Sequence, residues 1–219
     1  MDSVFDRFSS YADSLSHAGV AWFILVIGVI LAYFIGNINP AILLGRIYGV
    51  GDIRSHGSGN AGTTNVLRTL GKKAGAITLL IDVLKGVIPT VIALLAVNQA
   101  YAMLVALAVV VGHMWPAAHG FRGGKGVATT LGVLLAIDFR FALCLLAIFI
   151  ILVAIFRMVS LGVICACVLA IPMGLFFGPW HAIFIGIIAI LIIYKHRSNI
   201  VRIVKGTENK LSFGSKDKQ

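Results

Sequence analysis

Seven apolar stretches alternate with short polar segments along the chain. A helix that crosses a bilayer needs about 20 predominantly apolar residues, and most of these stretches approach that length. The pattern therefore predicts an all-α integral membrane protein with seven transmembrane helices. The predicted spans are residues 19–38, 74–97, 101–119, 126–137, 140–156, 160–177 and 180–195.

Two of these predicted spans are less well defined than the others. The span 126–137 has only 12 residues, which cover about 18 Å at a rise of about 1.5 Å per residue. Residues 39–48 follow the first span and contain Pro40. They either continue the first span or form a re-entrant piece, and the pattern leaves both arrangements open.

The composition agrees with a membrane protein. Of 219 residues, 59% are hydrophobic and 12% are charged, and the mean hydropathy is +1.01. A soluble domain of this size does not cover so much apolar surface with so few charges. We expect a short amphipathic lead-in over 1–18, one seven-helix membrane domain over 19–200, and a basic cytoplasmic tail over 201–219.

The distribution of positive charge predicts the orientation. The net charge is +10, from 18 Lys+Arg against 8 Asp+Glu. If the N-terminus lies outside, fifteen of these cations fall on the inner side, Arg7 and Arg140 fall outside, and Lys85 lies within a span. Because cytoplasmic loops carry an excess of Lys and Arg, the N-terminus is predicted outside and the C-terminus in the cytoplasm. Nucleic-acid binding is disfavoured, since no stacking aromatics alternate with the cations.

Three polar segments then share the cytoplasmic side, and the first is residues 51–73. Within it, Ser58 and Asn60 supply hydrogen-bonding side chains between glycines, and Arg68 adds positive charge. Such a set is typical of a site for an anion with several oxygens, above all a phosphate. The alternative is a solvated loop that carries juxtamembrane cations.

The second segment, residues 119–130, places Lys125 among glycines directly before a predicted span. A glycine-rich turn at a helix N-terminus favours an anion, because free N–H groups and the helix dipole point at it. The turn is not a Walker A loop, which requires Ser or Thr after the lysine, where this chain has Gly126. It indicates phosphate binding without nucleotide hydrolysis, and an ordinary interfacial turn is the alternative.

The third segment, residues 195–210, contains His196 and Asn199, which are three positions apart and so share one helical face. Glu208 follows further on. The only acidic residues on the inner side are Asp52, Glu208 and Asp217. With so few carboxylates a catalytic divalent metal is disfavoured, and no metal or other cofactor is expected. Catalysis would then rest on cations, amides and one imidazole.

Other polar residues have structural interpretations. Asp82 and Lys85 lie three positions apart within a span and are expected to form an ion pair. His113 and His119 are interpreted as part of an interfacial anchor, and Ser160 as a helix N-cap. The cysteines lie in apolar runs and are interpreted as small buried hydrophobic residues; they are Cys144, Cys165 and Cys167.

The segments GSGNAGTTNVLR, GFRGGKGVATT and KHRSNIVRIVKGTEN resemble, in order, the three signature motifs of the bacterial acyl-phosphate:glycerol-3-phosphate acyltransferases, the PlsY family. The resemblance implies transfer of a long-chain fatty acyl group from acyl phosphate to the 1-hydroxyl of glycerol 3-phosphate. The products are lysophosphatidate and phosphate, in phospholipid synthesis at the bacterial cell membrane. The resemblance implies catalytic roles for Ser58, Arg68, Lys125, His196 and Asn199. It implies substrate-binding roles for Asn60, Gly123, Gly124, Gly126 and Glu208.

The chemistry of an acyl phosphate fits this inventory. Its phosphate is a good leaving group, which cations can hold while backbone N–H groups stabilise the charge on the acyl oxygen. The base for the attacking hydroxyl is either His196 or a phosphate oxygen of a substrate. We hypothesise the phosphate, with His196 orienting glycerol 3-phosphate. No histidine is followed five positions later by aspartate, which speaks against a thioester donor of the His-x-x-x-x-Asp acyltransferases.

A transporter of an anionic phosphorylated metabolite or lipid is the alternative function, with the polar loops as its gate. Transporters place their sites near the membrane midplane, often between related halves. This sequence shows no internal repeat, and only Asp82 and Lys85 lie at depth. The sequence therefore favours the acyltransferase, whose partners are its two substrates and membrane lipid.

Overall fold

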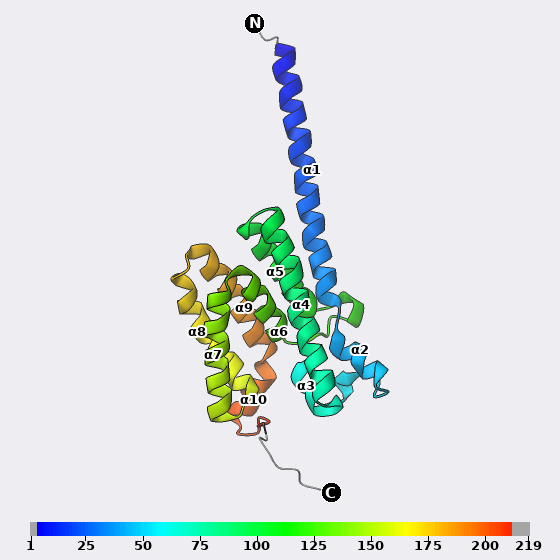
Figure 1. The fold of residues 1–219 in the computed structure, drawn as a ribbon, viewed down its shortest axis with the longest axis vertical. Coiled ribbons are helices and arrows are strands. Elements are labelled where there is room, and N and C mark those ends of the chain that lie inside the picture. Colours follow the sequence, from blue (N-terminus) through cyan, green and yellow to red (C-terminus); the bar gives the residue numbers. More distant parts are fainter. Residues whose placement is uncertain (1–3, 212–219) are drawn as a thin grey trace.

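The computed structural model describes residues 4–211, including their side chains except those of residues 4–18, 20 and 21. This part of the chain is helical and contains no strand, as predicted (Figure 1). The helices are α1 (Val4–Asn37), α2 (Pro40–Ile47), α3 (Thr63–Leu70), α4 (Lys72–Ala96), α5 (Gln99–Met114), α6 (Val127–Ile137), α7 (Phe139–Phe156), α8 (Val159–Leu175), α9 (Pro179–Lys195) and α10 (Arg197–Val204), with short 3₁₀ turns η1 (Ile53–Ser55) and η2 (Ala117–His119).

Each predicted span coincides with one helix, but helix length and hydropathy single out fewer crossings. Within the described residues, α6 and α8 are apolar helices of only 11 and 17 residues. The bent pair of α9 and α10 is long enough if it counts as one span. Four stretches qualify outright: Trp22–Ile47, Lys72–Ala96, Gln99–His119 and Phe139–Phe156. The structure thus supports a helical membrane bundle, and seven crossings remain a prediction.

The two ends of the chain differ from the predicted boundaries. Helix α1 begins at Val4, so the backbone of the lead-in is continuous with the first span (Figure 1). The amphipathic faces expected of residues 1–18 lie outside the described side chains. In the tail, α10 extends to Val204, and residues 212–219 lie outside the described range.

Residues 39–48 form their own helix, α2. The Asn39 side chain accepts a hydrogen bond from the N–H of Ile42 at 3.1 Å, and Pro40 occupies the first turn, where no N–H is needed. Together with α1 this helix belongs to one apolar stretch of 26 residues, Trp22–Ile47. Of the two arrangements left open by the sequence, the continuation of the first span is therefore favoured.

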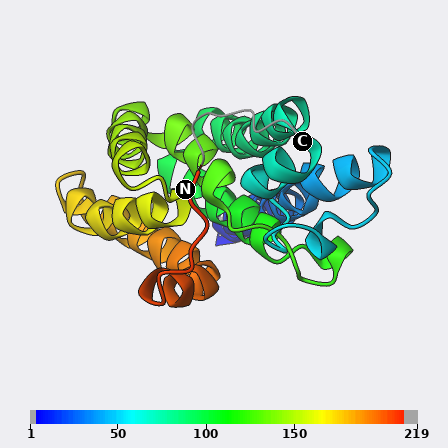
Figure 2. The ribbon, with the colours of Figure 1, turned by 90° about the horizontal axis from the view of Figure 1, so that it is seen from below.

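Close helix packing holds the bundle together, and glycines permit it. A Cβ on Gly112 of α5 would lie 2.1 Å from the carbonyl oxygen of Tyr33 in α1. A Cβ on Gly132 of α6 would lie 2.2 Å from the carbonyl oxygen of Val83 in α4. Small residues at such crossings let helix backbones approach in membrane bundles. Figure 2 shows α7, α8 and α9 on one side of the molecule, with α5 and α6 between them and α1 and α2.

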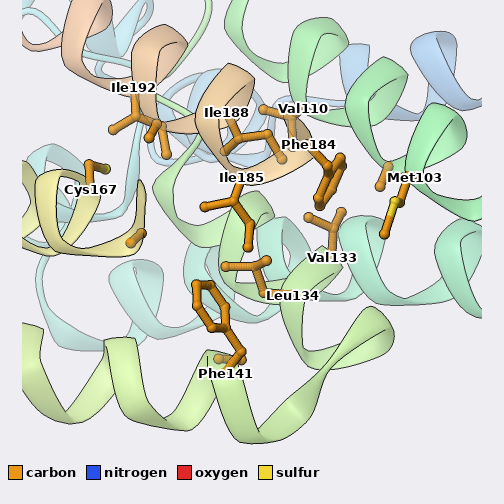
Figure 3. Packing of buried hydrophobic residues seen from close by; sticks show 14 of the residues in the cluster. Met103, Val110, Val133, Leu134, Phe141, Cys167, Phe184, Ile185, Ile188 and Ile192 are labelled. Atoms are coloured by element: carbon orange, nitrogen blue, oxygen red, sulfur yellow. The ribbon is translucent and has the colours of Figure 1, made fainter. Parts of the chain in front are cut away.

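The largest apolar core joins α5, α6, α7, α8 and α9 (Figure 3). Phe141 of α7, Leu134 of α6 and Ile185 of α9 meet there. Large apolar side chains also cover much of the outer surface, as lipid contact requires. Cys144 belongs to that exposed surface and Cys167 is buried, so the interpretation as a buried residue is wrong for Cys144 and confirmed for Cys167.

Candidate active site

A cavity of about 420 Å³ lies between α3, α4 and the helices α6 to α10. Its wall joins polar residues from all three predicted segments to apolar residues of α6, α7, α8 and α9. Gly123 and Gly124 belong to the turn beside it. The other predicted site residues line it: Ser58, Asn60, Arg68, Lys125, Gly126, His196, Asn199 and Glu208. The fold therefore brings together three segments that are far apart in the sequence.

The apolar part of the cavity follows one face of α9. Ile192, Ile188 and Ile185 line it below His196, and the stretch from Ile185 to His196 spans about 16 Å of helix at about 1.5 Å per residue. Figure 3 shows Ile185 near Leu134 of α6, and both residues line the cavity. Alanines on two further helices leave the space open, namely Ala142, Ala166 and Ala170.

A buried asparagine shapes the first loop, residues 51–62. The Asn65 amide donates to the carbonyl oxygens of Ile53 and His56, both at 3.0 Å, and its oxygen accepts from the N–H of Ser58 at 2.8 Å. A Cβ on Gly57 would lie 2.2 Å from that oxygen, so the loop closes only with glycine there. Asn65 therefore holds Ser58 at the cavity instead of binding an anion itself.

The glycine turn, residues 122–126, uses two of its backbone N–H groups within the protein. The N–H groups of Gly123 and Gly124 donate to the carbonyl oxygens of Met114 and His113, at 3.3 and 3.2 Å, and are not free for an anion. Gly126 has φ +82°, in the left-handed region, and begins α6 without a capping side chain. The first N–H groups of α6 follow at the cavity wall, so the amides without an intrahelical partner there are those of Val127 and Ala128.

Long-range hydrogen bonds hold this turn from several sides. Arg54 donates to the carbonyl oxygens of His119 at 3.0 Å and Arg122 at 2.8 Å. Asp52 orients Arg54 through a 2.7 Å ion pair, and that hydrogen bond lowers the pKa of the Asp52 carboxyl. Lys195 donates to the carbonyl oxygen of Met114 at 2.8 Å. The sequence did not indicate these roles for Asp52 and Arg54, because the partners of Arg54 are 65 and 68 positions away.

Glu208 organises the third segment. Its carboxylate accepts hydrogen bonds from the Asn199 amide, the Ser160 hydroxyl and the Arg202 guanidinium, each at 2.8 Å. Burial alone raises the pKa of Glu208, but these three donors outweigh it and the net pKa is lowered. The Asn199 oxygen in turn accepts from Lys125. Glu208 thus reaches the glycine turn through Asn199, and Lys125 is aimed into the cavity.

Two further titratable groups that line the cavity have lowered pKa values. Burial lowers the pKa of Lys125 to about 8, although the negative charge of Glu208 counteracts the shift. Burial and the cation of Lys125 lower the pKa of His196 to about 4. The His196 Nδ1 lies 2.8 Å from the carbonyl oxygen of Ile192, which only accepts, so Nδ1 carries the proton. A neutral His196 then offers Nε2 as an acceptor.

Two structural interpretations from the sequence are wrong, and one is confirmed. Ser160 does not cap α8, because the cap position is Met158 and the Ser160 hydroxyl donates to Glu208. His113 is not an interfacial anchor, since it is 3% exposed and faces Asp82. The expected ion pair of Asp82 and Lys85 is present at 2.8 Å. Both errors arose because the residue that each side chain contacts, Glu208 for Ser160 and Asp82 for His113, lies in another segment of the chain.

The groups that line the cavity are suited to a ligand with an anionic head and an apolar chain. Arg68 and Lys125 are cations at the polar end, and Arg68 has no carboxylate partner within the described residues. The α6 amides supply further donors for oxygen atoms. The apolar wall along α9 accommodates a hydrocarbon chain. The described residues contain no cluster of three or more His, Cys, Asp or Glu side chains placed to hold a metal.

Fold and site together define the class, a helical membrane protein with one cavity that has a cationic end and an apolar wall. A family model described as glycerol-3-phosphate acyltransferase matches residues 26–206. The chain belongs to this family and is an integral membrane acyltransferase.

Individual relatives agree with the family. The glycerol-3-phosphate acyltransferase of Clostridioides difficile is 46% identical over 200 residues, which cover 86% of this chain and 96% of that protein. The one from Alkaliphilus metalliredigens is 44% identical over 184 residues, 84% of this chain and 94% of that protein.

The crystal structures of PlsY (YgiH), an integral membrane glycerol 3-phosphate acyltransferase, are similar in fold. The glycerol 3-phosphate form has a TM-score of 0.82 at 38% identity, covering 86% of this chain and 96% of that chain. The lysophosphatidic acid form has a TM-score of 0.79 at 37% identity, covering 86% and 95%. The resemblance to the PlsY family found in the sequence is therefore confirmed.

Proposed function

We propose that this protein transfers a long-chain acyl group from acyl phosphate to the 1-hydroxyl of glycerol 3-phosphate, giving lysophosphatidate and phosphate. The reaction takes place at the cytoplasmic face of the bacterial inner membrane. The observation that carries the proposal is the cavity itself, whose cationic end adjoins an apolar channel along α9. The similarity to PlsY crystallised in glycerol 3-phosphate and lysophosphatidic acid forms supports the acceptor and the product.

Both substrates carry a phosphate, and the site offers two cationic groups to hold them. Lys125 with the first amides of α6 forms one, and Arg68 with Ser58 and Asn60 forms the other. The acyl chain of the donor lies in the apolar channel. Holding both substrates side by side lowers the barrier, because the reaction becomes effectively intramolecular.

In the proposed chemistry the glycerol 1-oxygen attacks the acyl carbon. A new ester C–O bond forms, the C–O bond to the donor phosphate breaks, and phosphate leaves with that electron pair. Lys125 and the α6 amides stabilise the negative charge on the oxygens. No metal enters any step.

The hydroxyl proton goes to a phosphate oxygen in this proposal. With a pKa of about 4, His196 is a weak base at neutral pH, whereas the second pKa of a phosphate monoester is about 6. The neutral His196 Nε2 instead accepts a hydrogen bond from the hydroxyl of glycerol 3-phosphate and orients it. Substrate-assisted proton removal therefore agrees better with these two pKa values than general-base catalysis by His196.

The test uses purified protein in detergent with a chelator present. Glycerol 3-phosphate is supplied with palmitoyl phosphate or, separately, with palmitoyl-CoA, and phosphate and lysophosphatidate are measured. We expect both products from palmitoyl phosphate only, and their loss in Lys125→Ala. Turnover with palmitoyl-CoA instead contradicts the acyl-phosphate donor. If neither donor yields lysophosphatidate, the proposed reaction itself is contradicted.

A further inference from the structure

Three ionisable side chains meet inside the bundle, outside the groups that the proposed chemistry uses. Lys85 Nζ lies 2.8 Å from Asp82 Oδ1 and 2.8 Å from His113 Nδ1. His113 Nδ1 lies 3.3 Å from the same Asp82 oxygen. The three residues are 5% exposed or less. They form a closed ionic cluster between α4 and α5.

The cluster directly supports the glycine turn. The His113 ring lies against Gly124 so closely that a Cβ there would be 2.1 Å from His113 Nε2. The His113 carbonyl oxygen accepts the Gly124 N–H at 3.2 Å, and a Cβ on Gly123 would lie 2.0 Å from that oxygen. The ring and the backbone of His113 therefore fix the position of the turn that carries Lys125.

Lys85 extends the same support to α1. Its Nζ donates to the carbonyl oxygens of Ile38 at 2.6 Å and Gly36 at 3.2 Å, at the break between α1 and α2. Asp82 and His113 also line the cavity, so the cluster lies next to the substrate space. One lysine in the middle of α4 thus joins the C-terminal ends of α1 and α5 next to the turn.

Stability alone does not explain such a cluster. Replacing a buried ion pair by apolar residues of similar volume is often neutral or stabilising, whereas removing one partner is strongly destabilising. Charged side chains within spans are costly and usually serve a function. A fixed contact with the anion-binding turn provides that function.

We infer that Asp82, Lys85 and His113 are positioning residues that hold the glycine turn in the position needed to bind a substrate phosphate. This role rests on the proposed function, because the turn must hold a phosphate. The three side chains do not contact the reacting atoms. They act through Gly124 on the placement of Lys125 and the first amides of α6.

The test compares two variants with a matched control, all as full-length protein in detergent. Asp82→Leu/Lys85→Met removes both charges while keeping similar volume. His113→Leu keeps the ion pair and removes the ring from Gly124. Thr90→Val is the control, because Thr90 is buried in the same helix α4 and donates only within it, to the Gly86 carbonyl oxygen. Thermal unfolding, kcat, both KM values and inhibition by inorganic phosphate are measured.

The positioning role predicts a split between stability and binding. The double variant unfolds near the wild-type temperature, but the inhibition constant of inorganic phosphate and the KM of at least one substrate rise about tenfold, with kcat changed less. His113→Leu shows the same rise and Thr90→Val shows none. Folded variants with wild-type constants overturn the role. Loss of the fold in both cluster variants, with Thr90→Val intact, also overturns it and makes the cluster a structural support.

The wild-type protein separates this role from the proposed function. If it does not turn over palmitoyl phosphate, the proposed function fails and the positioning role fails with it. If it is active and the folded cluster variants match it, only the positioning role fails.

Discussion

At the scale of single residues, Lys125 is a cation whose pKa lies close to physiological pH. Burial lowers this pKa to about 8, so the side chain is charged below that pH and neutral above it. Phosphate binding needs the charge, and kcat/KM reports groups of the free enzyme. We expect kcat/KM to fall about tenfold per pH unit above pH 8, as measured with both palmitoyl phosphate and glycerol 3-phosphate well below saturation.

Lys125→Arg isolates this effect. A guanidinium does not titrate in this range, so the variant has lower activity but no decline above pH 8. An unchanged decline in Lys125→Arg means that another group titrates, and the assignment to Lys125 is then wrong.

His196 has a different predicted role, and substitution separates orientation from base catalysis. We expect His196→Ala to raise the KM for glycerol 3-phosphate roughly tenfold, since one hydrogen bond of about 1–1.5 kcal/mol is lost. Turnover at saturating substrate should remain measurable. Steady-state kinetics with varied glycerol 3-phosphate provides the test. Complete loss of kcat, in a variant that unfolds like the wild type, identifies His196 as the base instead.

Sequence patterns singled out residues that line the cavity where residue type and local spacing carry the information. Lys125 between glycines and His196 three positions before Asn199 are recognisable in this way, and both line the cavity. His113 and Ser160 were misinterpreted because their partners are remote, 28 positions away at Lys85 and 48 at Glu208. Local spacing does not encode such contacts.

At the scale of elements, the approach of α4 to α6 sets the position of the helix N-terminus at the cavity. A Cβ on Gly132 would lie 2.2 Å from the Val83 carbonyl oxygen, which is backbone and does not yield easily. We expect Gly132→Ala to destabilise the protein by about 1–3 kcal/mol and to raise the KM for a phosphate substrate. Thermal unfolding in detergent and steady-state kinetics measure the two effects.

Gly186 of α9 is the matched control for this substitution. It is also a helical glycine, but nothing lies within 4 Å of a Cβ built there. Gly186→Ala should keep or raise stability, because alanine is the better helix former by about 1 kcal/mol. Equal losses in both variants mean that the close approach at Gly132 is not the cause.

The helices themselves follow from the apolar stretches, whereas their interruptions do not. Each predicted span contains one helix. The Asn39 cap and Pro40 mark the first break locally, whereas no local pattern indicated the 61° bend between α9 and α10. Lys85 of α4 holds the first break through the Ile38 carbonyl oxygen, and His196 lies at the second. Hydropathy detects a helix, but a bend that places a functional side chain is set by tertiary packing.

At the scale of the whole molecule, the orientation in the membrane decides which compartment supplies the substrates. The fifteen cations assigned to the inner side predict that the three polar segments, and hence the cavity, face the cytoplasm. Labelling of single cysteines tests this prediction. The background replaces Cys144, Cys165 and Cys167 with alanine, and Gln99→Cys and Lys205→Cys are introduced one at a time at exposed positions.

Five predicted spans separate these two positions, so an odd number of crossings places them on opposite sides. In intact spheroplasts a membrane-impermeant maleimide should label Gln99→Cys, and it should label Lys205→Cys only after permeabilisation. The reverse pattern places the cavity outside, where the cytoplasmic pool of glycerol 3-phosphate does not reach it. Labelling of both positions in sealed spheroplasts requires an even number of crossings between them. One of the short helices, α6 or α8, would then not span the membrane, and the seven-span arrangement would be wrong.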